Sequence, residues 1–218
     1  MQEIIGHVEA ESQISVPIWS VNHFLDNTTS NYLKLVTLRE ICRRYREGAE
    51  DSNFLISMNS YDLFPAVDDL YYKQNDLIVL ESKDQSAENF WHLFQYLHRP
   101  VVLFRDQSRL TPIYEIESNV SLKIVHLSLV SPVSFDLKGA MGVLIDLFSL
   151  KIFVQRANER NAEALTNLKN VVETSHLIED QCTPPGVRRF AINQLASIMD
   201  KQTRINRRLG IRNPRLRI

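Results

Sequence analysis

Residues 76–81 read Asp-Leu-Ile-Val-Leu-Glu, and the unbroken apolar run at their centre is the clearest strand signal in the chain. The preceding residues 69–73 (DLYYK) also favour a strand, and the Gln-Asn pair between the two runs suits a two-residue hairpin turn. Downstream, Ser86 can cap a helix that runs to about Arg99, and residues 101–105 (VVLFR) predict the next strand. This succession of strands and helix indicates an α+β fold.

Further elements are expected around this centre. Residues 14–21 (ISVPIWSV) read as a strand, which Pro17 would place at an edge or a bulge. A helix capped at residues 28–30 should run to Glu47 and end at Gly48, because its apolar residues recur at helical spacing. Additional strands are predicted at 54–58, 112–117 and 122–130. The order β-α-β-β-α-β, followed by two strands, predicts a mixed sheet with two flanking helices, as in a ferredoxin-like sandwich or a nuclease core with a peripheral first strand.

Strand signals end at Ser131-Pro132, where the pattern becomes helical. The stretch 134–178 is expected to be helical from Ser134 or Asp136 onward, either as one helix or as two. A last helix, 186–209, should follow the Pro-Pro pair that precedes it. The predicted organisation is a sheet domain at 1–131, a helical region at 132–209 and a basic flexible tail at 210–218.

Composition narrows the class of protein. Hydrophobic residues make up 44% of the 218 and charged residues 23%, which predicts a folded chain with a sizeable core. Cys42 and Cys182 lie far apart and form no CxxC pair, so a disulfide framework is not expected. The first residues lack the basic start of a signal peptide, and together these features favour the cytoplasm. Trp19 and Trp91 are both expected in the core.

The basic residues are concentrated near the C-terminus. Residues 201–218 contain seven of the 25 Lys and Arg residues and none of the 26 acids. Such a segment can bind a polyanion such as nucleic acid or dock on an acidic protein surface, and it can also be a solvated helix end. The arginines predicted to bind a polyanion are Arg204, Arg207, Arg208, Arg212, Arg215 and Arg217.

Four charged residues near the central hairpin form a candidate catalytic set. If the Gln-Asn pair is the turn, Asp68 pairs with Glu81, and a shift of one residue brings Asp69 there instead. Lys83 shares a face with Glu81, because side chains two apart in a strand point the same way. Two facing carboxylates repel each other unless a hard cation such as Mg²⁺ joins them. The expected metal ligands are Asp68 and Glu81.

The segment 40–105 resembles the PD-(D/E)xK nuclease superfamily, in which an Asp opens one strand, an apolar strand ends in Glu-x-Lys, and a helix and another strand follow. The resemblance implies Mg²⁺-dependent cleavage of DNA or RNA by Asp68 or Asp69, Glu81 and Lys83. It also implies an additional acid from the preceding helix, which Glu40 would supply.

The segment 122–180 has a strand, a Ser-Pro pair, an apolar helix and a charged helix. It is similar to uncharacterised bacterial proteins that accompany conflict or signalling NTPase systems, some of them likened to the N-terminal domain of the adaptor TRADD. This resemblance implies an antiviral-defence or signalling role without catalytic residues. The first functional hypothesis is therefore a non-catalytic interaction module without a cofactor, which pairs with a partner or with itself through helices 134–178 and 186–209. The alternative is the Mg²⁺-dependent nuclease.

Overall fold

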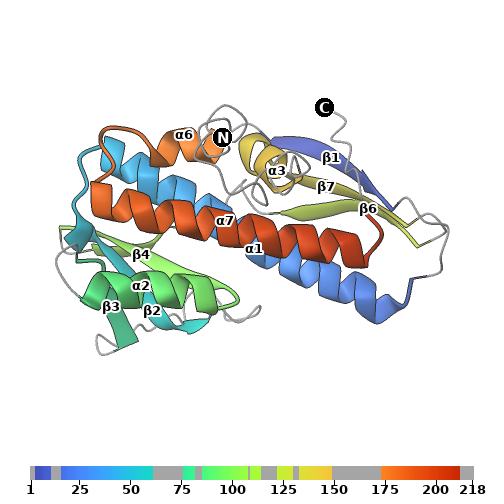
Figure 1. Cartoon of the computed structure of the whole chain (residues 1–218), viewed down its shortest axis with the longest axis horizontal. Helices are drawn as coiled ribbons and strands as arrows, with labels where there is room; N and C mark the ends of the chain where they lie inside the picture. Colours follow the sequence, from blue (N-terminus) through green and yellow to red (C-terminus); the bar gives the residue numbers. More distant parts are fainter. Residues whose placement is uncertain are drawn as a thin grey trace, which may run out of the picture. The chain divides into compact units, whose positions relative to one another are not determined.

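The computed structural model describes residues 3–10, 16–60, 76–81, 85–107, 109–113, 122–129, 133–148 and 173–211. The α+β class is confirmed: the described strands form two antiparallel sheets, of three and four strands, accompanied by helices (Figure 1). The chain divides into two compact units. The first unit comprises residues 1–35, 116–176 and 195–218, and the second comprises residues 36–115 and 177–194.

The first unit contains a three-stranded sheet in the order β1 (Glu3–Glu9), β7 (Ser134–Ala140), β6 (Lys123–Ser128). The N-terminal part of α1 (Ile18–Arg46), α3 (Met141–Phe148), the start of α6 (Glu173–Ile178) and the C-terminal part of α7 (Pro185–Arg208) belong to the same unit. Inside this unit, the buried Asp146 carboxylate accepts hydrogen bonds from the backbone and hydroxyl of Thr174, and so holds α3 to the start of α6.

The core of the first unit lies between α1 and the face of β7 that carries Phe135 and Gly139. The rings of Phe24 and Phe135 stack with centroids 5.0 Å apart. The backbone amide of Ala140 donates a hydrogen bond to Tyr32 Oη at 2.7 Å. A Cβ atom on Gly139 would lie 2.8 Å from the same hydroxyl, so this position requires glycine for the helix to approach the strand.

A buried polar network joins α1 to α7 within the first unit. Asn31 Nδ2 donates to Gln202 Oε1 at 2.9 Å, and Gln202 Nε2 donates to Thr28 Oγ1 at 3.0 Å. Gln202 Nε2 also lies 2.9 Å from Asn206 Oδ1, and all four side chains are buried. Buried polar groups are tolerated when hydrogen-bonded, so this network fixes the relative register of the two helices there.

The second unit contains a four-stranded sheet in the order β3 (Leu77–Val79), β2 (Phe54–Ser60), β4 (Pro100–Asp106), β5 (Arg109–Pro112). A short 3₁₀ helix, η1 (Asp51–Asn53), leads into β2, and α2 (Gln85–Tyr96) lies against the sheet (Figure 1). Since β3 and β4 are both antiparallel to β2, they are parallel to each other, and the β3-α2-β4 connection passes over β2. This is a split βαβ arrangement.

Aromatic packing dominates the core of the second unit. The last turns of α1 cover Phe54, whose ring centroid lies 4.9 Å from that of Tyr45. Trp91 of α2 is buried, as expected, and stacks on Phe190 of α7 with centroids 6.4 Å apart. Gln194 Nε2 donates to the Trp91 carbonyl at 3.2 Å.

Local sequence signals correctly predicted the C-terminal end of α1 at Gly48 and the extent of α7 to within one residue at each end. Gly48 and Gly210, with φ angles of 91° and 75°, follow α1 and α7. In each case the amides of the glycine and of the residue after it donate hydrogen bonds to carbonyls of the last helical turn. Ala49 N lies 3.0 Å from Arg44 O, and Ile211 N lies 2.8 Å from Asn206 O. Pro185 opens α7, where its missing amide is not needed.

The predicted strand at 14–21 is wrong over Ile18–Val21, because α1 begins at Ile18 rather than at residues 28–30. The carbonyl of Pro17 accepts the amide of Ser20 at 2.9 Å, so the proline lies just before the first helical turn. Val21 and Phe24 are buried at helical spacing. Burial of that face outweighs the strand propensity of the β-branched residues.

The helix predicted to start at Ser134 or Asp136 is also wrong, because residues 134–140 form β7 and the helix α3 starts only at Met141. In β7 the buried Phe135 and Leu137 alternate with half-buried polar residues, which is the period of a strand. The pairing of β6 with β7 spans residue 131, where the boundary between sheet domain and helical region was predicted. Residues 149–172 lie outside the described residues, so the predicted continuation of the helix stays a prediction.

Most of the remaining predicted strands and helices correspond to elements of the structure, and one strand was not predicted. The predicted strands at 54–58, 76–81, 101–105 and 122–130, the helix after Ser86 and the last helix correspond to β2, β3, β4, β6, α2 and α7. The strand β5 lies at Arg109–Pro112 and reaches the first residue of the strand predicted at 112–117, of which residues 114–117 lie outside the described residues. Sequence reasoning missed β1, in which Gly6 and two charged ends obscure an alternating pattern.

Candidate functional site

The central residue of the nuclease hypothesis, Glu81, lies two residues after the end of β3 and has an exposed side chain. The order β3-α2-β4 also matches the strand, helix and strand of the signature. Asp68, Asp69 and Lys83 lie outside the described residues, so their convergence with Glu81 stays a prediction. Among the residues that the structure describes, no group of three or more His, Cys, Asp or Glu side chains could hold a metal ion.

Glu40, the additional acid, is engaged by arginines of its own helix. Its carboxylate accepts hydrogen bonds from Arg43 Nε at 2.7 Å and Arg44 Nε at 3.2 Å. Burial acts to raise the pKa of Glu40, but the hydrogen bond and charge of Arg43, together with Arg44, outweigh it and hold that pKa below its ordinary value. Two guanidinium groups therefore already compensate the charge that a metal ion would neutralise.

The edge strand β6 carries an exposed apolar surface. In the described part of the chain, β7 is its partner on one side, and no strand lies on the other. Within β6, Val125 is 54% exposed, Ile124 is 49% exposed and Leu127 is 38% exposed. Leu129, which follows the strand, is 54% exposed. Exposed edge strands are templates for pairing with another chain, and proteins usually protect them with charges, prolines or coverage.

An irregularity in the β6–β7 ladder brings two of these apolar side chains to one face. Ile124 pairs with Leu137 and Leu127 pairs with Phe135, with the register shift between Ile124 and His126. Leu137 and Phe135 are buried on the core face of the sheet. Ile124 and Leu127 therefore extend that apolar face outward to the exposed edge.

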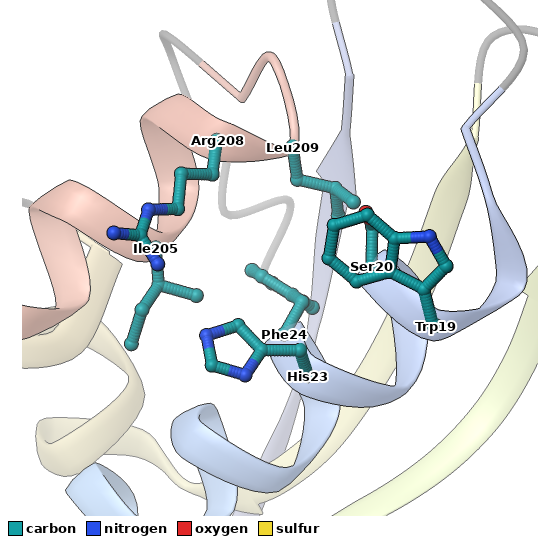
Figure 2. A pocket seen from close by; sticks show the side chains of 7 residues that line it. All are labelled: Trp19, Ser20, His23, Phe24, Ile205, Arg208 and Leu209. Carbon is teal, nitrogen blue, oxygen red and sulfur yellow. The ribbon is translucent and has the colours of Figure 1, made fainter.

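A cavity of about 350 Å³ opens in the first unit, where the start of α1 approaches the end of α7. Its lining residues are Trp19, Ser20, His23, Phe24, Ile205, Arg208 and Leu209 (Figure 2). Phe24, Ile205 and Leu209 are buried and form an apolar floor. In the view of Figure 2 the Trp19 indole lies at one side of the cavity, and the Arg208 guanidinium and His23 imidazole lie at the other.

The predicted core position of Trp19 is wrong, because this side chain is 71% exposed. The buried stripe of α1 runs through Val21 and Phe24, and Trp19 lies outside it. The sequence signal that could have indicated the cavity is the position of Trp19. It lies in the first turn of the helix but does not share the helical spacing of the buried residues.

Three of the six arginines predicted to bind a polyanion are described, and all are exposed on the last turns of α7. Arg204 forms an ion pair with Asp200, one helical turn earlier. Arg208 lines the cavity, and Arg207 is its neighbour in sequence. Arg212, Arg215 and Arg217 lie outside the described residues.

No family model matches the sequence, and no curated protein or solved structure gives a match to the chain. None of the helices in the described residues is long and apolar enough to cross a membrane.

Proposed function

We propose that the chain is a non-catalytic interaction module of a bacterial conflict or signalling system, and that it self-associates by pairing β6 with β6 of a second copy. The observation that carries this proposal is the exposed edge strand β6, with Ile124, Val125 and Leu127 open to solvent. Adding a strand to such an edge satisfies its backbone hydrogen-bonding groups and buries its apolar side chains.

The order of residues in β6 favours a second copy as the occupant. With a two-fold axis between residues 125 and 126, Ile124 of one copy faces Leu127 of the other. Both side chains lie on the core face of the sheet, so the pair is apolar and occurs twice. Lys123 faces Ser128, so no like charges oppose each other. A closed two-fold dimer uses one self-complementary patch on both copies.

Light scattering coupled to size exclusion tests this proposal. The full-length chain should elute as a dimer, and the double variant Ile124→Lys/Leu127→Lys should elute as a monomer because lysines on an edge oppose strand pairing. Tyr96→Lys is the matched control: Tyr96 is 80% exposed at the end of α2 in the second unit, so this variant should remain dimeric.

A monomeric wild-type chain, or a double variant that stays dimeric, would refute pairing through β6. The single variant Val125→Lys guards against misfolding, because Val125 is exposed at the irregularity of the ladder and its replacement leaves the described core untouched. At a protein concentration low enough for both proteins to be monomeric, its urea unfolding transition should match the wild type. Its dimer should dissociate at a higher protein concentration than the wild-type dimer.

The second candidate function is the Mg²⁺-dependent nuclease. The observation that favours it is the exposed Glu81, which lies between the end of β3 and the start of α2. Under this proposal Asp68 or Asp69 shares a Mg²⁺ ion with Glu81, and Lys83 orients the attacking water. Cleavage of single- or double-stranded DNA or RNA should require Mg²⁺ and should be lost in Glu81→Gln. The control variant Glu88→Gln changes an exposed acid on α2 and should cleave like the wild type. Cleavage that persists in Glu81→Gln would exclude this site.

A further inference from the structure

The cavity at the end of α7 combines features that neither candidate function uses. Its volume of about 350 Å³ is within the range of small-molecule sites, which begins at roughly 300 Å³. All of its lining residues belong to the first unit, in which α1 and α7 are tied together by the Asn31–Gln202 hydrogen bond. The cavity is therefore supported by rigid elements rather than by loops.

The walls of the cavity suit a flat ring. Phe24, Ile205 and Leu209 provide a buried apolar floor, and the exposed Trp19 indole stands at its side. The His23 ring is positioned by Asn27, whose Nδ2 lies 3.2 Å from His23 Nδ1. An exposed indole beside an apolar floor offers a stacking surface to a planar group.

The charge of the cavity suits an anion. Among the described residues that line it, Arg208 contributes a guanidinium cation and none is acidic. Arg204 and Arg207 lie within one helical turn of Arg208, and the sequence after α7 contains three more arginines and no acid. Positive charge thus continues from the cavity along the chain.

We propose that this cavity holds one nucleotide of a single-stranded nucleic acid, with its base stacked on Trp19 and its phosphate bound by Arg208. Proteins that bind single strands combine aromatic platforms for the bases with a basic path for the backbone. The bases of a duplex are already stacked on each other and cannot reach Trp19. An acidic peptide would satisfy Arg208 but has no base to stack on the indole.

The two tryptophans of the chain make stacking directly measurable. Trp19 is 71% exposed and Trp91 is 1% exposed, so an oligonucleotide in solution quenches the fluorescence of Trp19 alone. The full-length protein is titrated with oligodeoxythymidine in EDTA, which separates binding from any cleavage. We expect saturable quenching in the wild type and none in Trp19→Leu. In the anisotropy of labelled oligonucleotide, Trp19→Leu should bind with an affinity at least about fivefold weaker than the wild type. Trp19→Phe keeps a smaller ring and should bind with intermediate affinity.

The role of Arg208 is tested by the salt dependence of binding. For single strands, each phosphate contact contributes about 0.7 to the slope of log affinity against log salt, so Arg208→Gln should lower that slope by about 0.7. Tyr96→Leu and Arg189→Gln are matched controls, because each removes an exposed aromatic or an exposed arginine from the second unit. Both should bind like the wild type.

Three results would overturn the proposal. Absence of binding at low salt would do so directly. Equal affinity for a duplex, unaffected by Trp19→Leu, would assign binding to the basic residues alone. Polyglutamate that quenches Trp19 and displaces the oligonucleotide at equal charge concentration would identify the cavity as a site for acidic peptides. Because Trp19 is exposed, circular dichroism of Trp19→Leu should match the wild type, so that loss of binding reports on the site.

Discussion

Lys34 is a buried lysine in the middle of α1, and replacing it with methionine should stabilise the protein near neutral pH. The side chain is 3% exposed. Burial, reinforced by the charge of Lys201, lowers the pKa of Lys34 from 10.5 to about 7. Methionine has a similar length and flexibility and carries no charge to desolvate.

Stability depends on pH because the pKa of Lys34 differs between the folded and the unfolded protein. Above a pH of about 7 the folded protein releases the Lys34 proton, while the unfolded chain keeps it up to about 10.5. Stability rises with pH wherever the unfolded state binds more protons, so the free energy of unfolding should increase between these two values. At about 1.4 kcal/mol per pH unit, the wild type should gain about 2 to 3 kcal/mol between about pH 6 and about pH 9.

Urea denaturation followed by Trp91 fluorescence, repeated across this pH range, measures the effect. Lys34→Met should remove most of the gain and should exceed the wild type by about 2 kcal/mol or more near pH 6. Lys201→Gln should keep the slope but begin it at a slightly higher pH, because the charge of Lys201 is the smaller of the two causes that lower the pKa of Lys34. A wild-type profile that is flat over this range, or a Lys34→Met variant that keeps the slope, would refute the reasoning.

Two further predictions concern packing and thiol reactivity. Gly139→Ala should destabilise the protein by about 1 to 3 kcal/mol in urea denaturation, because its Cβ would lie 2.8 Å from Tyr32 Oη. Gly186→Ala, in the first turn of α7, should be neutral or stabilising, because its Cβ would meet nothing within 4 Å. Equal stability of the two variants would contradict the close helix–strand contact. Titration with a thiol reagent should detect one cysteine in the native protein and two in denaturant. Cys182 is exposed, whereas burial raises the pKa of the Cys42 thiol to about 12. Rapid modification of both thiols in the native protein would contradict the burial of Cys42 on α1.

The sequence by itself determined the elements that carry strong local signals. The Pro-Pro pair before α7 and Gly48 after α1 act through neighbouring backbone groups. The apolar run of β3 is a property of consecutive residues, so these signals can be identified without knowledge of the fold. The uneven charge of the C-terminal residues is likewise a property of composition. These signals were sufficient to predict the α+β class and the last helix.

Only the tertiary structure decided which strands pair and which side chains remain exposed. β1 and β7 meet across more than a hundred residues, and this pairing gives residues 134–140 an alternating buried face that makes them a strand. The exposure of Trp19 depends on which face of α1 is buried, and its approach to Arg208 depends on two helices that are far apart in sequence. Burial, strand pairing and the convergence of side chains depend on atoms brought together by folding, whereas propensity and capping depend on neighbours along the chain. For that reason the sequence indicated the basic end of α7, and only the folded chain placed an exposed tryptophan beside it.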